Sequence, residues 1–293
     1  MDLGLLTQVL LSGLGLGAVY ALVAFGFGVV FNATGAINFA QGEYVMLAGV
    51  TAGAAHEMWG LSVAPSILVA IAVTICIGLL TEVSILGLGR LRSPAGITIA
   101  TIAVAVIIKG VVMLASGRDT FALPGLLGEN PIRVGSATTS PQTFINVALA
   151  LVVVVLLTLF FKRSKLGTTL RAAADDDETL QSFGISFRTT ARWAFVIAAL
   201  LGAIAGAGLA PFTVMSFDSG TLLGLKGFAA AMLGGLGNPY GALVGGLLLG
   251  IAEAVVGGYG SPAYADTVAF VVLLLVLFTR PAGIMGRLAT VRT

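Results

Sequence analysis

Long apolar stretches separated by short polar segments run along the whole chain. Four wider regions contain no Asp, Glu, Lys or Arg: Leu3 to Gly42, Val134 to Phe161, Trp193 to Phe217, and Gly227 to Ala252. A helix needs about 20 apolar residues to cross the hydrocarbon core, where every backbone polar group must be paired within the segment. We therefore predict an all-α polytopic membrane protein with eight or nine helical segments, at residues 5–31, 40–59, 65–88, 95–116, 142–161, 190–211, 222–236, 240–257 and 266–281.

Two of these segments are followed by similar polar breaks. The helix ending near Phe31 leads into 32–38 and then Gly42-Glu43, and the helix at 199–211 leads into 216–220 and then Lys226-Gly227. Paired broken helices of opposite orientation are how transporters build a site at the bilayer midplane. The pattern predicts an inverted repeat with broken or re-entrant helices, although similar low-complexity helices would mimic it. We expect five polar residues of the breaks to line a substrate pathway or its gates, with Glu43 and Lys226 as a candidate pair: Asn38, Gln41, Glu43, Asp218 and Lys226.

Composition supports a single membrane domain over residues 1–293. The chain is 58% hydrophobic and 10% charged, whereas a soluble domain carries about 25% charged residues. Glycines recur four residues apart in the apolar segments, as in Gly13 and Gly17 or Gly246 and Gly250, and this spacing indicates close helix packing in lipid. We expect a multi-pass protein of a cell membrane.

The distribution of basic residues predicts the orientation. The regions around 90–92, 162–192 and 280–292 hold 11 of the 15 Lys and Arg residues, so the positive-inside rule places them in the cytoplasm. The loop 117–141 then lies outside. Nine crossings put the N-terminus outside and the C-terminus inside, and one re-entrant segment would change that parity.

The sequence offers no catalytic constellation. His56 is the only histidine and Cys76 the only cysteine, whereas a metal site usually needs three or four ligands and a serine nucleophile needs a base within reach. None of the four lysines is followed by Ser or Thr, so the phosphate-binding loop of an ATPase is missing. We expect no enzyme activity, metal or cofactor in this chain, and any ATP would be hydrolysed by partner subunits.

Five ionisable residues lie at or near membrane depth: Glu43, Glu82, Lys109, Lys226 and Glu253. Such residues are usually paired, hydrated or functional. Glu43 is placed to cap the helix beginning near Gly42, and Glu82 is close enough to a helix end to reach water. Lys226 and Glu253 fall near unfavourable ends of their predicted helices, and Lys109 is deepest, so the sequence leaves their roles open.

The segment 166–186 is the most informative soluble part. It is bracketed by basic residues, carries the acidic run Asp175 to Glu178, and has a partly apolar face at helical spacing. Because an anionic membrane surface attracts Lys and Arg, the acidic run favours a protein partner. Leu180 and Phe183 are the expected anchors, and Gly184 the expected helix end.

Three separated motifs resemble the branched-chain amino-acid ABC transporter permeases of the LivH type, in order over nearly the whole chain. They are Gly17 to Leu22 with Gly35 to Glu43, then Arg171-Ala172 to Ile185, then Leu225 to Gly237 with Gly241 to Glu253. Gln41 stands where the family usually has His, and the run Asp175 to Glu178 is more acidic than the family pattern.

The resemblance implies a permease that pairs with a second, homologous permease, two cytoplasmic ATPases and an extracytoplasmic solute-binding protein in an importer. It implies that 166–186 couples the permease to the ATPase, through Arg171, Asp176, Leu180, Phe183 and Gly184. The implied substrates are leucine, isoleucine and valine, but also urea, short amides or aromatic acids. The alternative from the residues is an ion-coupled secondary transporter that uses Glu43 and Glu253.

Overall fold

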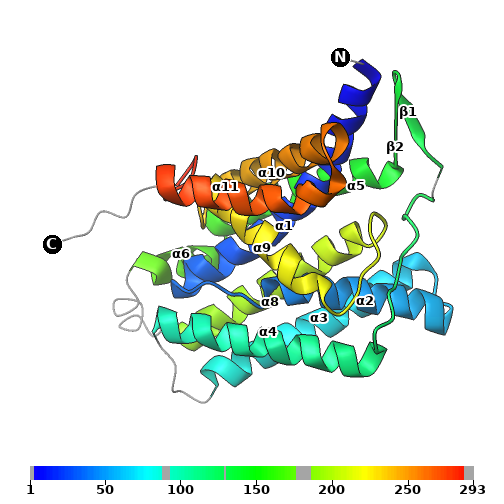
Figure 1. Ribbon diagram of the computed structural model, residues 1–293. Coiled ribbons are helices and arrows are strands. Elements are labelled where there is room, and N and C mark those ends of the chain that lie inside the picture. The colour runs from blue at the N-terminus through cyan, green and yellow to red at the C-terminus, as the bar shows by residue number, and fades with distance from the viewer. Residues whose placement is uncertain (1–2, 88–92, 129, 176–185, 287–293) are drawn as a thin grey trace.

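The computed structural model describes residues 3–87, 93–128, 130–175 and 186–286 (Figure 1). A short antiparallel hairpin, β1 (Ile132–Val134) with β2 (Ala137–Thr139), lies between α4 and α5, and a 3-10 helix, η1 (Pro262–Tyr264), precedes α11. The α-helices are α1 (Leu3–Thr34), α2 (Gln41–Trp59), α3 (Val63–Leu86), α4 (Pro94–Ser116), α5 (Pro141–Arg163), α6 (Lys165–Asp175), α8 (Phe187–Leu209), α9 (Ser219–Gly234), α10 (Pro239–Tyr259) and α11 (Ala265–Thr279).

All nine predicted apolar segments are helical, so the prediction of an all-α polytopic membrane protein is confirmed. Seven helices in the described part of the chain are long and apolar enough to cross a membrane. The two core helices that fall outside this set, α2 and α9, are those that follow the predicted breaks. Large apolar side chains are exposed on the outer faces of α3, α4, α5 and α11, where lipid would cover them.

Three of the described α-helices begin with the same local arrangement, a capping side chain followed by proline. Ser93 Oγ accepts a hydrogen bond from Gly96 N at 3.1 Å ahead of α4, and Ser140 Oγ accepts one from Gln142 N at 3.2 Å ahead of α5. Asn238 Oδ1 does the same for Tyr240 N and Gly241 N ahead of α10. Proline suits the first helical position because its missing N–H would have no partner there.

The helices alternate in direction between two ends of the bundle. The hairpin end carries the start of α1, since Gln8 Oε1 accepts from Thr138 N at 2.7 Å, and the end of α2, since Glu57 Oε1 accepts from Ala122 N at 2.9 Å. The opposite end carries the turn after α1 and the turn between α9 and α10. Asn32 Nδ2, near the end of α1, donates to Gly237 O in the second of these turns at 2.7 Å. The start of α1 and the segment 117–141 therefore share one face, as nine alternating crossings require.

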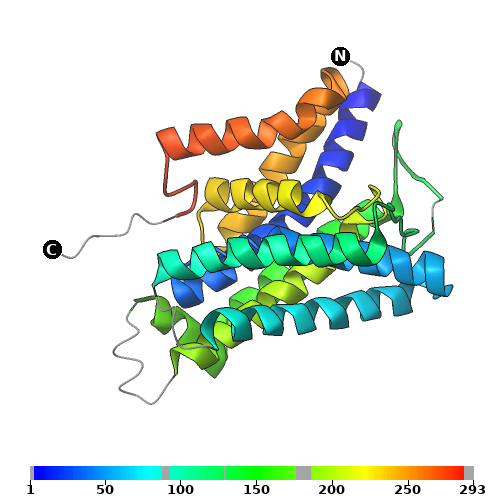
Figure 2. The same ribbon diagram turned by 60° about the horizontal axis from the view of Figure 1, so that its bottom comes forward.

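The packing pattern is that of an inverted repeat. In this repeat α1, α2 and α3 correspond to α8, α9 and α10. The contact of α1 with α10 then matches that of α8 with α3, and the contact of α2 with α8 matches that of α9 with α1. The contact of α2 with α3 corresponds in the same way to the contact of α9 with α10. In the chain, α5 and α6 come between the two sets of helices. Figures 1 and 2 show α9 in the middle, between α10 with α11 on one side and α2 with α4 on the other.

Glycine contacts bring the helix backbones together at the crossings. A Cβ added to Gly13 or Gly17 would meet the α10 backbone near Ile251 and Leu247, and one added to Gly42 would overlap the backbone of Gly224 in α9. The close packing predicted from the glycine spacing is confirmed at the α1–α10 crossing. Small residues allow this approach in lipid, where the gain comes from van der Waals contact between helices.

Cysteine labelling would determine which end of the bundle faces the cytoplasm. In a Cys76→Ala background, we expect Ser136→Cys, on the hairpin, to react with an impermeant maleimide in intact cells. Thr168→Cys, exposed on α6, should react only after permeabilisation. The reason is that α6 lies beside a cluster of basic residues, and such clusters mark the cytoplasmic side. The reverse labelling pattern would show that the topology is inverted.

Candidate functional site

The two polar breaks lead into helices that touch each other. Thr221 Oγ1, in the first turn of α9, donates to Glu43 Oε1, near the start of α2, at 3.3 Å. The contact is close because both helices present glycine: Gly42 lies against Gly224, and Gly220 lies against the Glu43 carboxylate. Residues 42–43 and 220–224, at the starts of the two helices, thus lie against each other.

Beside this contact an open groove lies between α2, α4 and α9. Its walls are mostly apolar, but Glu43 from α2 and Lys109 from α4 both face it. The lining residues are Phe39, Glu43, Ile102, Ala105, Val106, Lys109, Thr221, Gly224 and Leu225. The groove therefore offers one carboxylate and one ammonium group among aliphatic side chains.

Neither charge of the groove is neutralised by a close ion pair. Within the described residues, the ion pairs shorter than 4.0 Å do not include Glu43 or Lys109. Glu43 is 3% exposed and its Oε2 has no hydrogen-bond partner there. The Lys109 ammonium lies 5.9 Å from the centre of the Phe217 ring, at the end of the second break. Glu43 and Lys109 are therefore both without a close ion-pair partner among the described residues.

The other residues of the breaks occupy different surroundings. Asn38 and Gln41 are fully buried: Asn38 Oδ1 accepts from Ala40 N at 3.1 Å, and Gln41 Nε2 donates to Ala198 O at 3.0 Å. Asp218 lies in the turn before α9, where Ser216 Oγ donates to it at 2.6 Å and lowers the pKa of its carboxyl. Of these residues, Glu43 lines the groove, whereas Asn38 and Gln41 bind backbone groups of Ala40 and Ala198.

The suggested pairing of Glu43 with Lys226 is wrong. Lys226 lies on another face of α9, and its Nζ is 2.7 Å from Glu253 Oε1 on α10 and 2.7 Å from Asp266 Oδ1 on α11. α9 begins at Ser219 and α10 continues to Tyr259, so neither Lys226 nor Glu253 is at a helix end as the sequence indicated.

Glu82 also differs from the expectation that it reaches water. Its side chain is fully buried, and it pairs with Arg192 Nε at 3.0 Å and Arg188 Nε at 3.5 Å. Both arginines lie in the first two turns of α8 and are about half exposed. The ion pairs join the end of α3 to the start of α8.

Sequence reasoning missed Tyr20 and Asp266 as polar partners inside the bundle. Tyr20 lies in the Gly17 to Leu22 motif, and its hydroxyl donates to Glu253 Oε2 at 2.9 Å. Asp266, in the first turn of α11, was not singled out. The motif itself was the available signal for Tyr20, since it places a phenol in a helix with no other polar side chain nearby in sequence.

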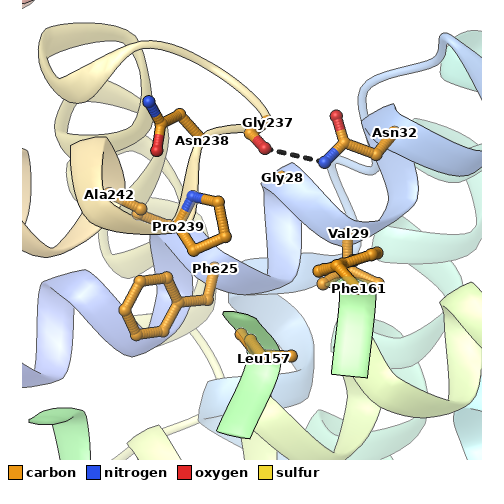
Figure 3. Close-up of a pocket in the computed structure, with 11 residues that line it drawn as sticks. Phe25, Gly28, Val29, Asn32, Leu157, Phe161, Gly237, Asn238, Pro239 and Ala242 are labelled. Atoms are coloured by element: carbon orange, nitrogen blue, oxygen red, sulfur yellow. Dashed lines mark hydrogen bonds between the residues drawn. The ribbon is translucent and has the colours of Figure 1, made fainter. Parts of the chain in front are cut away.

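A small apolar pocket lies at the end of the bundle opposite the hairpin, where α1, α5 and the α9–α10 turn meet (Figure 3). Phe25, Leu157, Phe161 and Pro239 form its walls, and Asn32 points across it to Gly237 O. The hydrogen bond joins the end of α1 to the turn. This hydrogen bond therefore connects the two repeats beside the pocket.

The described part of the predicted coupling segment is α6. It begins after Ser164, whose Oγ accepts from Gly167 N at 2.8 Å, and it packs on α1, α5 and α8. Arg171 lies in α6, whereas Asp176, Leu180, Phe183 and Gly184 lie outside the described residues. In the described ranges no group of three His, Cys, Asp or Glu residues is arranged to hold a metal ion.

Comparison with known proteins gives a consistent result. Residues 9–277 match the family model described as branched-chain amino acid transport system / permease component. The chain is 36% identical over 295 residues to the high-affinity branched-chain amino acid transport system permease protein BraD of Pseudomonas aeruginosa, which covers 96% of this chain and 95% of BraD. It is 34% identical over 294 residues to the Escherichia coli permease protein LivH, with the same coverage.

A solved structure has a similar fold. PsaBC from Streptococcus pneumoniae, determined in complex with a Fab, aligns with a TM-score of 0.50 over 96% of this chain and 94% of that one. The sequence identity is 15%, so this likeness concerns the fold alone.

Proposed function

The chain belongs to the family of branched-chain amino acid transport system permease components, and we propose on that basis that it carries these amino acids inward as one half of an ATP-driven importer's membrane pathway. It is the membrane-spanning permease subunit of an ABC transporter, located in the inner membrane. Membership of this family sets aside the alternative of an ion-coupled secondary transporter.

We propose that the groove between α2, α4 and α9 is this subunit's share of the translocation pathway. The observation that carries the proposal is that Glu43 and Lys109 face one apolar groove without a close ion pair between them. A branched-chain amino acid is a zwitterion with an aliphatic side chain. Glu43 would receive its ammonium group, Lys109 its carboxylate, and Ile102, Val106 and Leu225 its side chain.

The proposed partners follow from the openness of the groove and from the family. A second, homologous permease would cover the groove and complete the pathway, two cytoplasmic ATPases would supply the energy, and an extracytoplasmic binding protein would deliver the substrate. The walls of the groove are mostly apolar. An apolar site distinguishes aliphatic side chains weakly, because a single methylene changes the binding free energy by only about 1–3 kcal/mol. We therefore assign most of the selection to the binding protein. Asn38, Gln41, Asp218 and Lys226 remain candidates for gate or supporting roles.

Reconstitution would test this function. The permease, its partner permease, both ATPases and the binding protein would be placed in vesicles, and uptake of labelled leucine, isoleucine and valine measured with and without internal ATP. We expect uptake that requires both ATP and the binding protein. Uptake driven by an ion gradient without ATP would overturn the proposal, and ATP-driven uptake of urea or a sugar alone would overturn the proposed substrate.

We propose that 166–186 transmits motion between the ATPase and the membrane helices. α6 contacts α1, α5 and α8, and α8 is also tied to α3 through Glu82, so a force applied there reaches both repeats. The expected anchors are Leu180 and Phe183, with Arg171 and Asp176 at the rim and Gly184 ending the segment. Apolar anchors usually carry most of an interface's energy, about 2 kcal/mol or more for a good one.

Truncating both anchors should uncouple the transporter. We expect Leu180→Ala with Phe183→Ala to leave the permease inserted, while association with the ATPase, measured by co-purification, and uptake fall together by tenfold or more. Arg133→Ala, on the hairpin at the opposite end, is the control and should change neither. Normal ATPase binding and uptake in the double variant would show that another segment couples the two subunits.

A further inference from the structure

The buried surface of α9 is almost smooth. All sixteen residues of this helix are described, and its buried positions other than Leu223 and Lys226 are glycine or alanine. Gly224 lies against Gly42, Gly227 against Val23, and Gly234 against Gly241, so α9 meets its neighbours largely backbone to backbone. Such surfaces permit close approach, but they have few protruding side chains that would fix how far the helix is turned or shifted along its axis.

Lys226 is the one charged side chain of α9, and it binds across helices, whereas Phe228 makes an aromatic contact with Phe27 of α1. Its Nζ lies 2.7 Å from Glu253 Oε1 on α10, 2.7 Å from Asp266 Oδ1 on α11 and 3.3 Å from the Tyr20 hydroxyl on α1. The Lys226 side chain is 6% exposed and that of Glu253 is 10% exposed, whereas Asp266 is 58% exposed. Tyr20 also donates to Glu253, so the cluster of these four residues joins four helices.

The same turn of α9 faces the groove. Thr221, Gly224 and Leu225 line it, and Leu225 is the neighbour of Lys226 in the chain. A shift that broke the Lys226 contacts would therefore turn these three residues away from Glu43 and Lys109. A single buried polar side chain is known to fix helix register at some cost in stability.

We propose that Lys226 is the positioning residue of α9: its contacts with Tyr20, Glu253 and Asp266 hold the groove-lining face of this helix in register. The inference rests on the proposed function, in that the groove is the pathway. It also assigns a role to α11, which buries only Ala269 and Val276. α11 is attached to α9 near both its ends, through Asp266 and through Ile284 N and Met285 N, which donate to Leu233 O and Gly234 O at 2.8 and 2.9 Å. These contacts therefore join α11 to α9 on both sides.

The test must separate positioning from charge compensation. Replacing Lys226 alone leaves Glu253 buried without its cation, which is strongly destabilising, whereas removing both charges of a buried pair is often tolerated. The main variant is therefore Lys226→Met with Glu253→Gln, which keeps an acceptor for Tyr20. Tyr20→Phe is the second variant, because it keeps both charges and nearly the whole volume.

Two reporters read the register of α9 in the assembled transporter, in a Cys76→Ala background. Leu225→Cys faces the groove and Leu223→Cys is buried, so a water-soluble thiol reagent should label the first at least tenfold faster. In the Lys226→Met/Glu253→Gln variant we expect this ratio to fall below threefold and uptake to fall at least tenfold, at a membrane level within twofold of the parent. Tyr20→Phe should lower both the ratio and uptake about threefold. Glu82→Gln, which removes a buried carboxylate that does not contact α9, should leave the ratio unchanged.

The outcomes are distinct. An unchanged ratio in Tyr20→Phe and in the double variant would overturn the proposal, whether or not uptake falls, because Lys226 would then only compensate Glu253. If the double variant fails to insert, the ratio in Tyr20→Phe decides alone. If the parent complex takes up no amino acid, the proposed function fails, while the labelling ratio still reports the register of α9.

Discussion

Replacing Gly42 with alanine is expected to separate α2 from α9 and to abolish most of the uptake. A Cβ at this position would overlap the Gly220 carbonyl and the backbone of Gly224, and backbone atoms cannot rotate away as the end of a side chain can. Overpacking costs about 1–3 kcal/mol where side chains can adjust, so we expect a loss of about 3 kcal/mol. Gly42→Leu should yield no folded protein.

Gly110→Ala is the matched control, because a Cβ there meets nothing within 4 Å. Alanine is preferred to glycine inside a helix by about 1 kcal/mol, so this variant should be as stable as the parent or slightly more so. The measurements are the thermal stability of the detergent-purified permease and uptake in vesicles. Equal stability of Gly42→Ala and Gly110→Ala would show that the α2–α9 crossing is looser than described.

Neutralising either charge of the groove should reduce uptake by about 10- to 100-fold without loss of folded protein. Glu43→Gln keeps an oxygen for Thr221, and Lys109→Met keeps the length and most of the volume of the side chain. A hydrogen bond to a charged group contributes about 1.5–3 kcal/mol, and each 1.4 kcal/mol corresponds to a factor of ten. Each variant removes one such contact with the zwitterion.

Uptake of labelled leucine by the reconstituted complex would measure this effect, with the substrate affinity of the binding protein as an internal reference that should not change. Glu57→Gln is the control, since Glu57 lies at the hairpin end and accepts a hydrogen bond from Ala122 N that a glutamine can also accept. Uptake within twofold of the parent in both groove variants would place the pathway elsewhere.

Hydropathy predicted the helices because each must satisfy its own backbone in lipid, which makes the signal local. The nine segments follow from that signal, and the glycine spacing predicted the crossing of α1 with α10. The partners of the buried charges do not, because Lys226 and Tyr20 lie 206 residues apart and only the packing of α1, α9, α10 and α11 brings them together. Lys109 is similar: its depth in α4 was visible in the sequence, whereas its position opposite Glu43 depends on how α4 lies against α2.

The pairing of Lys226 with Glu43 was a natural expectation, since both residues follow a break and have opposite charges. It fails because α9 is a helix: Thr221 and Leu225, four residues apart, face the groove, and Lys226 is turned away to the neighbouring face. The hairpin at 132–139 was not predicted at all. It is three residues per strand, and its register is fixed partly by Gln8 of α1, a residue far from it in sequence.

The order of synthesis gives the Lys226 contacts a consequence for membrane insertion. When Lys226 leaves the ribosome, Glu253 is still 27 residues behind it and Asp266 further still. A lone lysine costs about 2.5–3.5 kcal/mol at the centre of a bilayer, and this 16-residue helix is not among those apolar and long enough to enter without help. A nascent chain arrested before Glu253 is therefore expected to leave α9 in the translocon or at the membrane surface, and α9 to enter the bilayer only together with α10 and α11.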